Sequence, residues 1–227
     1  MEKFVIDGGV PLQGDVTPAG NKNAALPLLA ACLLTDEPVT LHNVPDIGDV
    51  QAMRRLLESL GVDIQVNENT WVVQAQTVTP ADLDPDLTRK IRASILLAGP
   101  MTARFGELRL PPPGGDVIGR RRVDTHLLAL KKLGANIDYD RNFTFQAKGL
   151  RGADILLDEA SVTATENAIM ACALAKGESV LRNAASEPHV QELCHFLNRL
   201  GARISNIGSN TLNIEGVSRL HGGEFTI

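Results

Sequence analysis

A segment of about seventy residues occurs three times in this chain of 227 residues, and this repeat limits the possible folds more than any other feature. Its clearest part spans residues 50–64, 123–137 and 190–204, where a valine stands eleven residues before the glycine of a Leu-Gly pair (61 − 50, 134 − 123 and 201 − 190). The apolar spacing predicts amphipathic helices, and the glycines predict their C-terminal ends. The glycines are 73 and 67 residues apart (134 − 61 and 201 − 134), which sets the repeat length.

Each copy also has an almost wholly apolar stretch upstream of its amphipathic helix. These stretches are residues 24–34, 92–103 and 167–175. A helix that is apolar on all sides is buried on all sides. Strands are expected directly after each amphipathic helix and at residues 39–43, 70–74, 107–110, 144–147, 153–157, 179–182 and 211–214. The repeat therefore predicts an α/β (α+β) fold with three buried helices at the centre, surrounded by sheets and amphipathic helices.

The three copies are expected to form one complete domain from residue 20 to residue 227. Its repeats span about 20–80, 86–149 and 152–217. Residues 1–19 lie outside the repeat, and within them residues 4–9 and 12–16 are predicted to form two short strands around a turn.

The charge and cysteine content exclude several classes of protein. The chain has 22 Lys and Arg against 27 Asp and Glu, a net charge of −5, so a broad basic surface for nucleic acid is not expected. Cys32, Cys172 and Cys194 lie in apolar helical contexts without CxxC spacing, and no His, Cys or Asp set has metal-ligand spacing. No apolar run is long enough to span a membrane. We therefore expect reduced thiols in a cytoplasmic protein.

The stretch LPPPGGDVIGRRRVDTH, residues 110–126, is the main candidate for a functional loop. Asp116 and the arginines Arg120, Arg121 and Arg122 precede a predicted helix. Arginines at the positive end of a helix are repelled by that end unless an anion binds there. The other two copies have acidic or helix-capping residues at this place, which favours an anion site here. We expect a phosphorylated substrate, with Asp116 as the proton-handling group; the alternative is an exposed loop before an ordinary helix.

The starts of the three apolar helices carry different polar residues. If the copies are related by threefold symmetry, these starts converge at one end of the domain. Lys22 and Arg92 would then lie near the arginine cluster at 120–122 and form a site for more than one phosphate or carboxylate. The alternative is that both are solvated charges at helix ends. His126 occupies a place taken by apolar residues in the other copies, so we expect a partly buried helix residue rather than a base.

Six motifs closely resemble those of one protein family. They are GNKNAALP at 20–27, RAS at 92–94, PGGDVIGRR at 113–121, VDTH at 123–126, ATEN at 164–167 and NAASEP at 183–188. The family is that of the bacterial UDP-N-acetylglucosamine 1-carboxyvinyltransferases. The resemblance implies two similar domains, each a threefold-repeated inside-out α/β barrel, with the active site between them. It also implies transfer of the enolpyruvyl group from phosphoenolpyruvate to the 3′-hydroxyl of UDP-N-acetylglucosamine, the first committed step of peptidoglycan synthesis, without a metal or organic cofactor.

The resemblance implies roles for individual residues. Lys22 and Asn23 match residues that hold phosphoenolpyruvate, and Arg92 matches an arginine near the substrate phosphates. Asp116 stands at the position of the general acid that protonates the methylene carbon, and Arg121 matches an arginine that contacts both substrates. The segments that bind uridine correspond to Val123, Asp124, Thr125, Ser161 and Val162.

The chain departs from the family pattern in three ways. Asp116 replaces the cysteine that most members carry, although an aspartate subgroup exists. Arg122 stands in place of a proline and Glu159 in place of a lysine. The resemblance also implies a second, C-terminal domain after Ile227, which residues 1–19 would complete and which would supply the base. The 227-residue chain is therefore expected to be the N-terminal half of the enzyme and inactive alone.

Two other functions stay open. A shikimate-pathway enolpyruvyl transferase would share the fold but not the PGGD and VDTH motifs. A non-catalytic half-protein would bind a UDP-sugar or pair with another chain.

Overall fold

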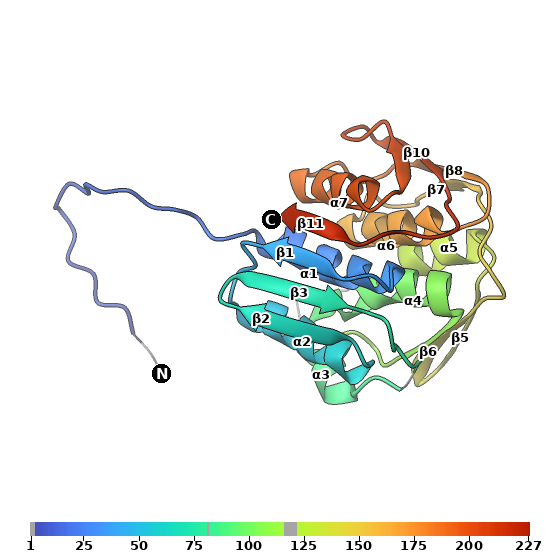
Figure 1. Cartoon of the computed structure of the whole chain (residues 1–227), viewed down its shortest axis with the longest axis horizontal. Coiled ribbons are helices and arrows are strands. Elements are labelled where there is room, and N and C mark those ends of the chain that lie inside the picture. Colours follow the sequence, from blue (N-terminus) through green and yellow to red (C-terminus); the bar gives the residue numbers. More distant parts are fainter. Residues whose placement is uncertain (1–2, 81, 116–121) are drawn as a thin grey trace.

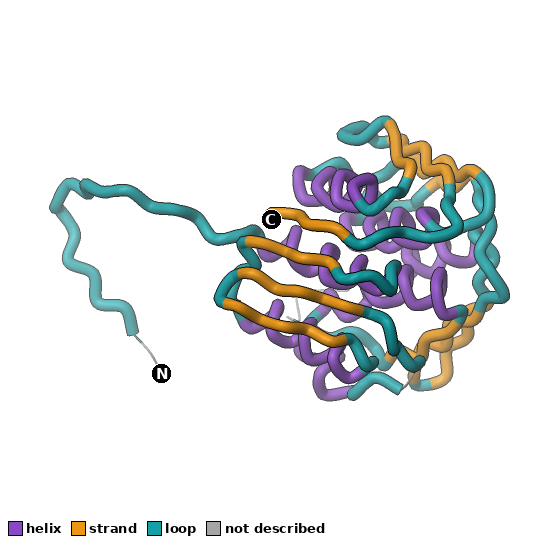
Figure 2. The backbone as a smooth tube through the Cα atoms, in the orientation of Figure 1, coloured by secondary structure: helices purple, strands orange, loops and turns teal. Residues whose placement is uncertain are grey.

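The helices of the chain gather in the middle of the domain, and the strands lie outside them (Figure 2). The computed structural model describes residues 3–80, 82–115 and 122–227. Its central helices are the predicted apolar ones, and most of their side chains are buried. They are α1 (Lys22–Ala31) with η1 (Cys32–Leu34), η2 (Arg92–Leu97) with α4 (Ala98–Phe105), and α6 (Val162–Ala173). The prediction of three buried helices at the centre is therefore confirmed.

The three amphipathic helices each bury one face against the rest of the domain. They are α2 (Gly48–Ser59), α5 (Asp124–Lys132) and α7 (Pro188–Arg199). Each ends just before its predicted glycine, and Gly61, Gly134 and Gly201 have φ angles of +92°, +100° and +102°. This left-handed backbone closes a helix, and glycine adopts it without the steric strain of a side chain.

In the described part of the chain, three sheets surround the helices, one for each copy of the repeat. The first contains β1 (Val39–His42), β2 (Asp63–Asn67), β3 (Thr70–Gln74) and β11 (Gly223–Thr226). The second contains β4 (Glu107–Leu110), β5 (Asn136–Asp140) and β6 (Asn142–Gln146). The third contains β7 (Asp154–Leu156), β8 (Glu178–Arg182), β9 (Arg203–Ser205) and β10 (Thr211–Glu215). The strands predicted within the repeat are confirmed, with bounds that shift by one or two residues.

Each sheet also contains a parallel pairing. β7 pairs with β8, and Asp82 makes a parallel bridge to Arg109 of β4. β11, at the far end of the sequence, pairs in parallel with β1, with Val39 opposite Gly223. Figure 1 shows this last strand, in red, beside the blue β1. The pairing closes the three copies into a ring, because the first sheet takes its parallel strand from the end of the chain.

The segment before the repeat differs from the prediction. The two strands expected at residues 4–9 and 12–16 are not formed, and the segment projects from the domain (Figure 1). Phe4 is 95% exposed and Leu12 is 100% exposed. A strand forms only when its N–H and C=O groups pair with a neighbour, and the described residues offer this segment no ladder. The repeat also fails to predict β11, the short helix α3 (Pro85–Lys90) and the early start of α6 at Val162.

Removal of residues 222–227 is expected to lower the free energy of unfolding by about 2–4 kcal/mol. The deletion removes the β11 ladder and the edge-to-face contact of Phe225 with Phe196, whose ring centroids are 5.4 Å apart. Urea denaturation followed by circular dichroism measures the change. Removal of residues 1–18 is the matched control, and it should change the unfolding free energy by less than about 0.5 kcal/mol. Equal effects of the two deletions would contradict closure of the ring by β11.

Candidate active site

The N-terminal ends of the three central helices meet at one pocket of about 410 Å³. α1, η2 and α6 contribute side chains at equivalent positions that are seventy residues apart (92 − 22 and 162 − 92). The first position holds Lys22, Arg92 and Val162, the second Asn23, Ala93 and Thr163, and the third Leu26, Leu96 and Glu166. The convergence of helix starts predicted from the repeat is confirmed, and it brings Lys22, Asn23 and Arg92 to one site.

Side-chain caps at equivalent positions fix the starts of α1 and α6. Asn21 accepts a hydrogen bond from the N–H of Asn23 at 2.7 Å, and Ser161 accepts one from the N–H of Ala164 at 3.5 Å. Asn and Ser are favoured at this position because they satisfy free N–H groups in the first helical turn. The local sequence therefore determines where each helix begins and which side chains reach the pocket.

Lys22 and Arg92 supply positive charge to the pocket. Lys22 Nζ lies 3.0 Å from Asp49 Oδ2, and these side chains are 48% and 45% exposed. Arg92 Nη2 donates to the carbonyl oxygen of Arg122 at 3.0 Å, which ties η2 to the segment before α5. An exposed ion pair contributes less than about 1 kcal/mol, so an anion can compete with Asp49 for Lys22. The arrangement is suited to binding an oxyanion between α1 and η2.

Gly115 lines the same pocket because the Pro-Gly-Gly segment packs closely against the chain from α3 to η2. The N–H groups of Gly114 and Gly115 donate to the carbonyl oxygens of Thr88 and Arg89 at 3.3 and 3.0 Å. A Cβ atom at position 114 would lie 1.8 Å from the Arg89 oxygen, so only glycine fits there. This close approach places the start of the loop at the candidate site.

Asp116, Arg120 and Arg121 lie outside the described residues, so their predicted roles stay predictions. The described residues on either side of them are Gly115, which lines the first pocket, and Arg122, which lines a second one. Both ends of the loop therefore reach the region that the sequence assigns to substrate.

The second pocket, of about 440 Å³, adjoins the first, since Arg92, Val162 and Thr163 line both. Ser161 and Glu159 line it as well. The structure therefore brings Ser161 and Val162, two of the predicted uridine-binding residues, next to the phosphate-binding candidate Arg92.

The side chains of the VDT segment, residues 123–125, do not line either pocket. Val123, Asp124 and Thr125 are absent from both linings. Asp124 forms an ion pair with Arg122, and Thr125 Oγ1 donates to Asp158 Oδ1 at 2.7 Å. Their predicted contact with uridine stays a prediction.

Five ionisable residues of the first pocket have no role in the sequence prediction: Asp49, Lys90, Glu166, Glu187 and His189. The N–H of Ala185 donates to Thr165 Oγ1 at 3.0 Å, which ties α6 to the segment leading into α7. Glu166 is 2% exposed, and its pKa is raised well above the ordinary value by burial and then by the charge of Glu187. The one charged side chain in a mostly apolar central helix is the sequence signal that identifies this residue.

His126 is buried in α5 and serves as a structural link, consistent with the helix residue predicted from the repeat. Asn167 Oδ1 accepts from the N–H of Gly99 at 2.6 Å, so the Nδ2 of Asn167 donates to His126 Nδ1 at 2.8 Å. The proton of the neutral ring is therefore on Nε2, which lies 3.2 Å from Thr163 Oγ1. Burial and then the charge of Arg92 lower the pKa of His126 to about 3.

When the pH falls from 7 to about 4.5, protonation of His126 in the unfolded chain is expected to lower the free energy of unfolding by about 2–3 kcal/mol. The pKa of its ring is about 3 in the fold and about 6.5 in an unfolded chain, so at intermediate pH only the unfolded state takes up the proton. The contribution is present above about pH 6.5 and lost as the pH falls. Urea denaturation of the wild type and His126→Gln at both pH values measures it. An equal loss in the two proteins would contradict a neutral buried histidine.

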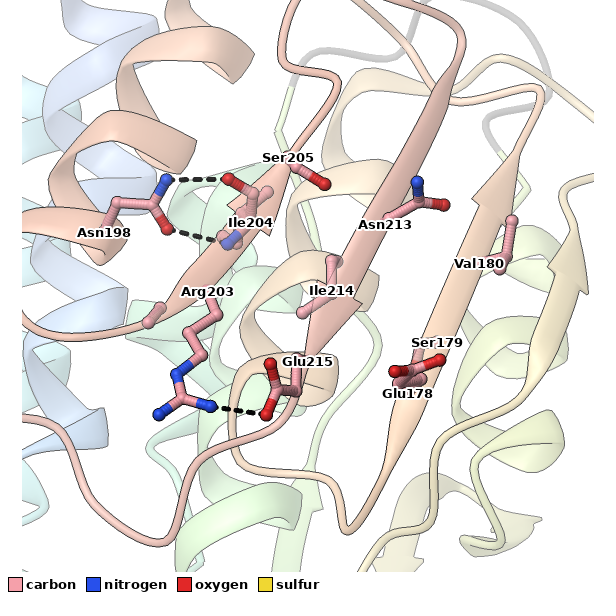
Figure 3. Close-up of a pocket in the computed structure, with 11 residues that line it drawn as sticks. Glu178, Ser179, Val180, Asn198, Arg203, Ile204, Ser205, Asn213, Ile214 and Glu215 are labelled. Atoms are coloured by element: carbon pink, nitrogen blue, oxygen red, sulfur yellow. Dashed lines mark hydrogen bonds and ion pairs between the residues drawn. The ribbon is translucent and has the colours of Figure 1, made fainter.

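A larger cavity, of about 570 Å³, lies on the third sheet, and its lining includes Asn198 of α7 (Figure 3). Three of its polar side chains, those of Asn198, Arg203 and Glu215, already pair with one another or with the backbone. Asn198 exchanges two hydrogen bonds of 2.8 Å with the backbone of Ile204, and Arg203 forms an ion pair with Glu215. A ligand there would have to break these pairs, so the pocket at the helix starts is the better candidate.

The described part of the chain gives no metal centre and no membrane-crossing helix. No group of three or more His, Cys, Asp or Glu side chains in it could hold a metal ion. None of its helices is long and apolar enough to cross a membrane. Cys32, Cys172 and Cys194 are buried and free, and burial raises the pKa of the last two thiols to about 12.

Comparison with known proteins identifies the family. The family model described as EPSP synthase (3-phosphoshikimate 1-carboxyvinyltransferase) matches residues 6–227. The chain belongs to this family. Within it, the chain is 55% identical over its whole length to a protein from Treponema denticola named UDP-N-acetylglucosamine 1-carboxyvinyltransferase. Proteins of the same name from Treponema pallidum and Bradyrhizobium diazoefficiens are 53% and 54% identical, over 100% and 99% of the chain.

The chain spans about half the length of the curated relatives it matches: 54% of the two Treponema proteins and 52% of the Bradyrhizobium protein. Solved structures of the family have the same fold. The enolpyruvyl transferase NikO from Streptomyces tendae superposes with a TM-score of 0.83 at 24% identity, over 97% of this chain and 53% of that one. EPSP synthase from Acinetobacter baumannii gives a TM-score of 0.75 at 18% identity, over 94% and 49%. The predicted enolpyruvyl transferase fold is confirmed.

Proposed function

We propose that this chain carries substrate-binding and catalytic residues of a transferase that moves the enolpyruvyl group from phosphoenolpyruvate to the 3′-hydroxyl of UDP-N-acetylglucosamine. The observation that supports this most is the pocket where Lys22, Asn23 and Arg92 converge, in a chain 55% identical to a relative of that name. The chain spans about half of that relative, so the complete site would include residues of a further domain, which residues 1–19 would help to form.

The phosphoenolpyruvate side of the site would use the first pocket. Lys22 and Arg92 would bind the phosphate and carboxylate oxygens, with Asn23 beside them. Asp116 would protonate the methylene carbon while the sugar 3′-hydroxyl gives its proton to a base of the further domain and its oxygen bonds to the neighbouring carbon. Phosphate would then leave as the new methyl group returns a proton to the Asp116 carboxylate, which regenerates the vinyl group. Arg121 would stabilise the phosphate charge during these steps.

The UDP-N-acetylglucosamine side would use the second pocket, lined by Ser161 and Val162. Val123, Asp124 and Thr125 would complete the uridine site. The reaction belongs to peptidoglycan synthesis and hence to cell shape and division, and we place it in the cytoplasm, with no nucleic-acid or membrane partner.

Two other functions predict different results in the same experiment. The family description and the EPSP synthase structures favour 3-phosphoshikimate as acceptor, although those structures are only 18% identical to the chain. The half-length match to the relatives fits a non-catalytic UDP-sugar-binding protein.

A chimera tests the proposal. Residues 1–227 replace the matching part of the Treponema denticola relative, and phosphate release is measured with phosphoenolpyruvate and either UDP-N-acetylglucosamine or 3-phosphoshikimate. We expect release with the UDP-sugar only, and none from the 227-residue chain alone, which should fold and bind the UDP-sugar weakly. Release with 3-phosphoshikimate would favour the shikimate enzyme. A folded chimera that binds the UDP-sugar without release would favour the non-catalytic protein, and turnover by the chain alone would contradict the need for a further domain.

A further inference from the structure

One position of the pocket is apolar in two copies of the repeat and carries a carboxyl group in the third. Leu26, Leu96 and Glu166 occupy this position, each five residues after the N-cap of its helix (26 − 21, 96 − 91 and 166 − 161). The two leucines are buried, at 6% and 1% exposed. A leucine therefore suits the packing of this place, and packing gives no reason for the glutamate.

The carboxyl group of Glu166 has unsatisfied hydrogen-bonding capacity. Its side chain is buried, and Oε1 has no hydrogen-bond partner in the described part of the chain. An unsatisfied buried polar group costs about 1–3 kcal/mol, and a buried unpaired charge costs more. The raised pKa favours the neutral acid form, which has an O–H to donate.

The neighbours of Glu166 indicate what it would bind. Among the described residues, the charged or titratable side chains around it are Lys22 of α1, Asp49 of α2, Lys90 of α3, Arg92 of η2, and Glu187, His189 and Cys194 at or in α7. The starts of α1 and α6 and the cations Lys22 and Arg92 favour an oxyanion in this pocket. An ionised Glu166 would repel such a ligand, whereas a neutral acid can donate a hydrogen bond to it.

We propose that Glu166 is a further substrate-binding residue, whose carboxyl O–H donates a hydrogen bond to the oxyanion held by Lys22 and Arg92. The inference rests on the proposed function only for naming that oxyanion as a phosphate or carboxylate group of phosphoenolpyruvate. The proton stays on the carboxyl group, so no covalent bond is made or broken.

Sulfate is the probe for the test, because its charge does not change between about pH 6 and pH 9. The 227-residue chain is titrated with sulfate, and backbone amide NMR shifts report the affinity. We expect Glu166→Leu to weaken binding at least tenfold and Glu166→Gln to restore it to within threefold of the wild type. Glu178→Leu, at an exposed position on the third sheet, is the control and should bind normally. Sulfate binding by Glu166→Leu at the wild-type affinity, or no binding by the wild type, would overturn the proposal.

Two more readouts separate binding from a structural role. Urea denaturation should show Glu166→Leu to be as stable as the wild type or more stable, since leucine fits this position in the other copies. Sulfate affinity of the wild type should fall as the pH rises through the raised pKa of Glu166, and Glu166→Gln should lack this fall. The other titratable groups are common to both proteins, so their difference reports Glu166. A Glu166→Leu variant that loses stability and binding together would overturn the proposal.

The two proposals fail differently. If sulfate binding by the chain depends on Glu166 but the wild-type chimera releases no phosphate, the proposed function is wrong and the oxyanion-binding role stands. If the chimera turns over and Glu166→Leu leaves the KM for phosphoenolpyruvate unchanged, the role of Glu166 is wrong.

Discussion

Replacement of Asp116 by alanine in the chimera should lower kcat by about 10²–10⁴-fold, which is the usual contribution of general acid catalysis. A general acid must keep its proton until the transition state, whereas a free aspartic acid has a pKa of about 3.9. Burial, or bound substrate anions that offset the neighbouring arginines, must therefore favour the protonated form. Phosphate release measures the loss, and Asp116→Ala with full activity would remove this residue from the mechanism.

Asp116→Cys should keep turnover and gain sensitivity to fosfomycin. The cysteine-bearing transferases that the chain resembles are inactivated by this epoxide analogue of phosphoenolpyruvate, which alkylates the thiolate. A carboxylate is a much weaker nucleophile toward an epoxide than a thiolate, so the unmodified chimera should resist the compound. The variant should show time-dependent inactivation, a shifted pH optimum and an adduct on residue 116 by mass spectrometry. Rapid inactivation of the unmodified chimera would contradict the role of Asp116.

Arg121→Ala should cripple the chimera, and Arg120→Ala should have a mild effect. Loss of a charge-assisted contact to a desolvated phosphate or carboxylate costs about 2–5 kcal/mol, or roughly 30- to 5,000-fold in kcat/KM. The two arginines are adjacent and have the same charge, so each variant is the electrostatic control for the other. Steady-state kinetics at fixed salt measures both. Equal effects of the two variants would show that the loop is aligned wrongly with the family motif.

The sequence determines the local elements of this protein because their signals lie within a few residues of one another. The period of apolar side chains predicts α2, α5 and α7, and Gly61 and its equivalents end these helices through a backbone that glycine adopts readily. The seventy-residue spacing also predicts that Lys22 and Arg92 meet, because equivalent helices in a closed repeat start at the same end. Agreement among three copies strengthens each prediction.

The tertiary structure decides what depends on partners far along the chain. β11 becomes a strand through its ladder with β1, 184 residues away (223 − 39), whereas the apolar N-terminal segment has no such ladder in the described residues and stays extended. The third position of the pocket shows the same dependence. In the sequence, Glu166 is the one charged residue of a helix that is mostly apolar. Burial among α1, η2 and α7 and the charge of Glu187 raise its pKa, and Oε1 has no partner among the described residues. Periodicity reports which face of a helix is buried, and only the packed neighbours determine the chemistry of that face.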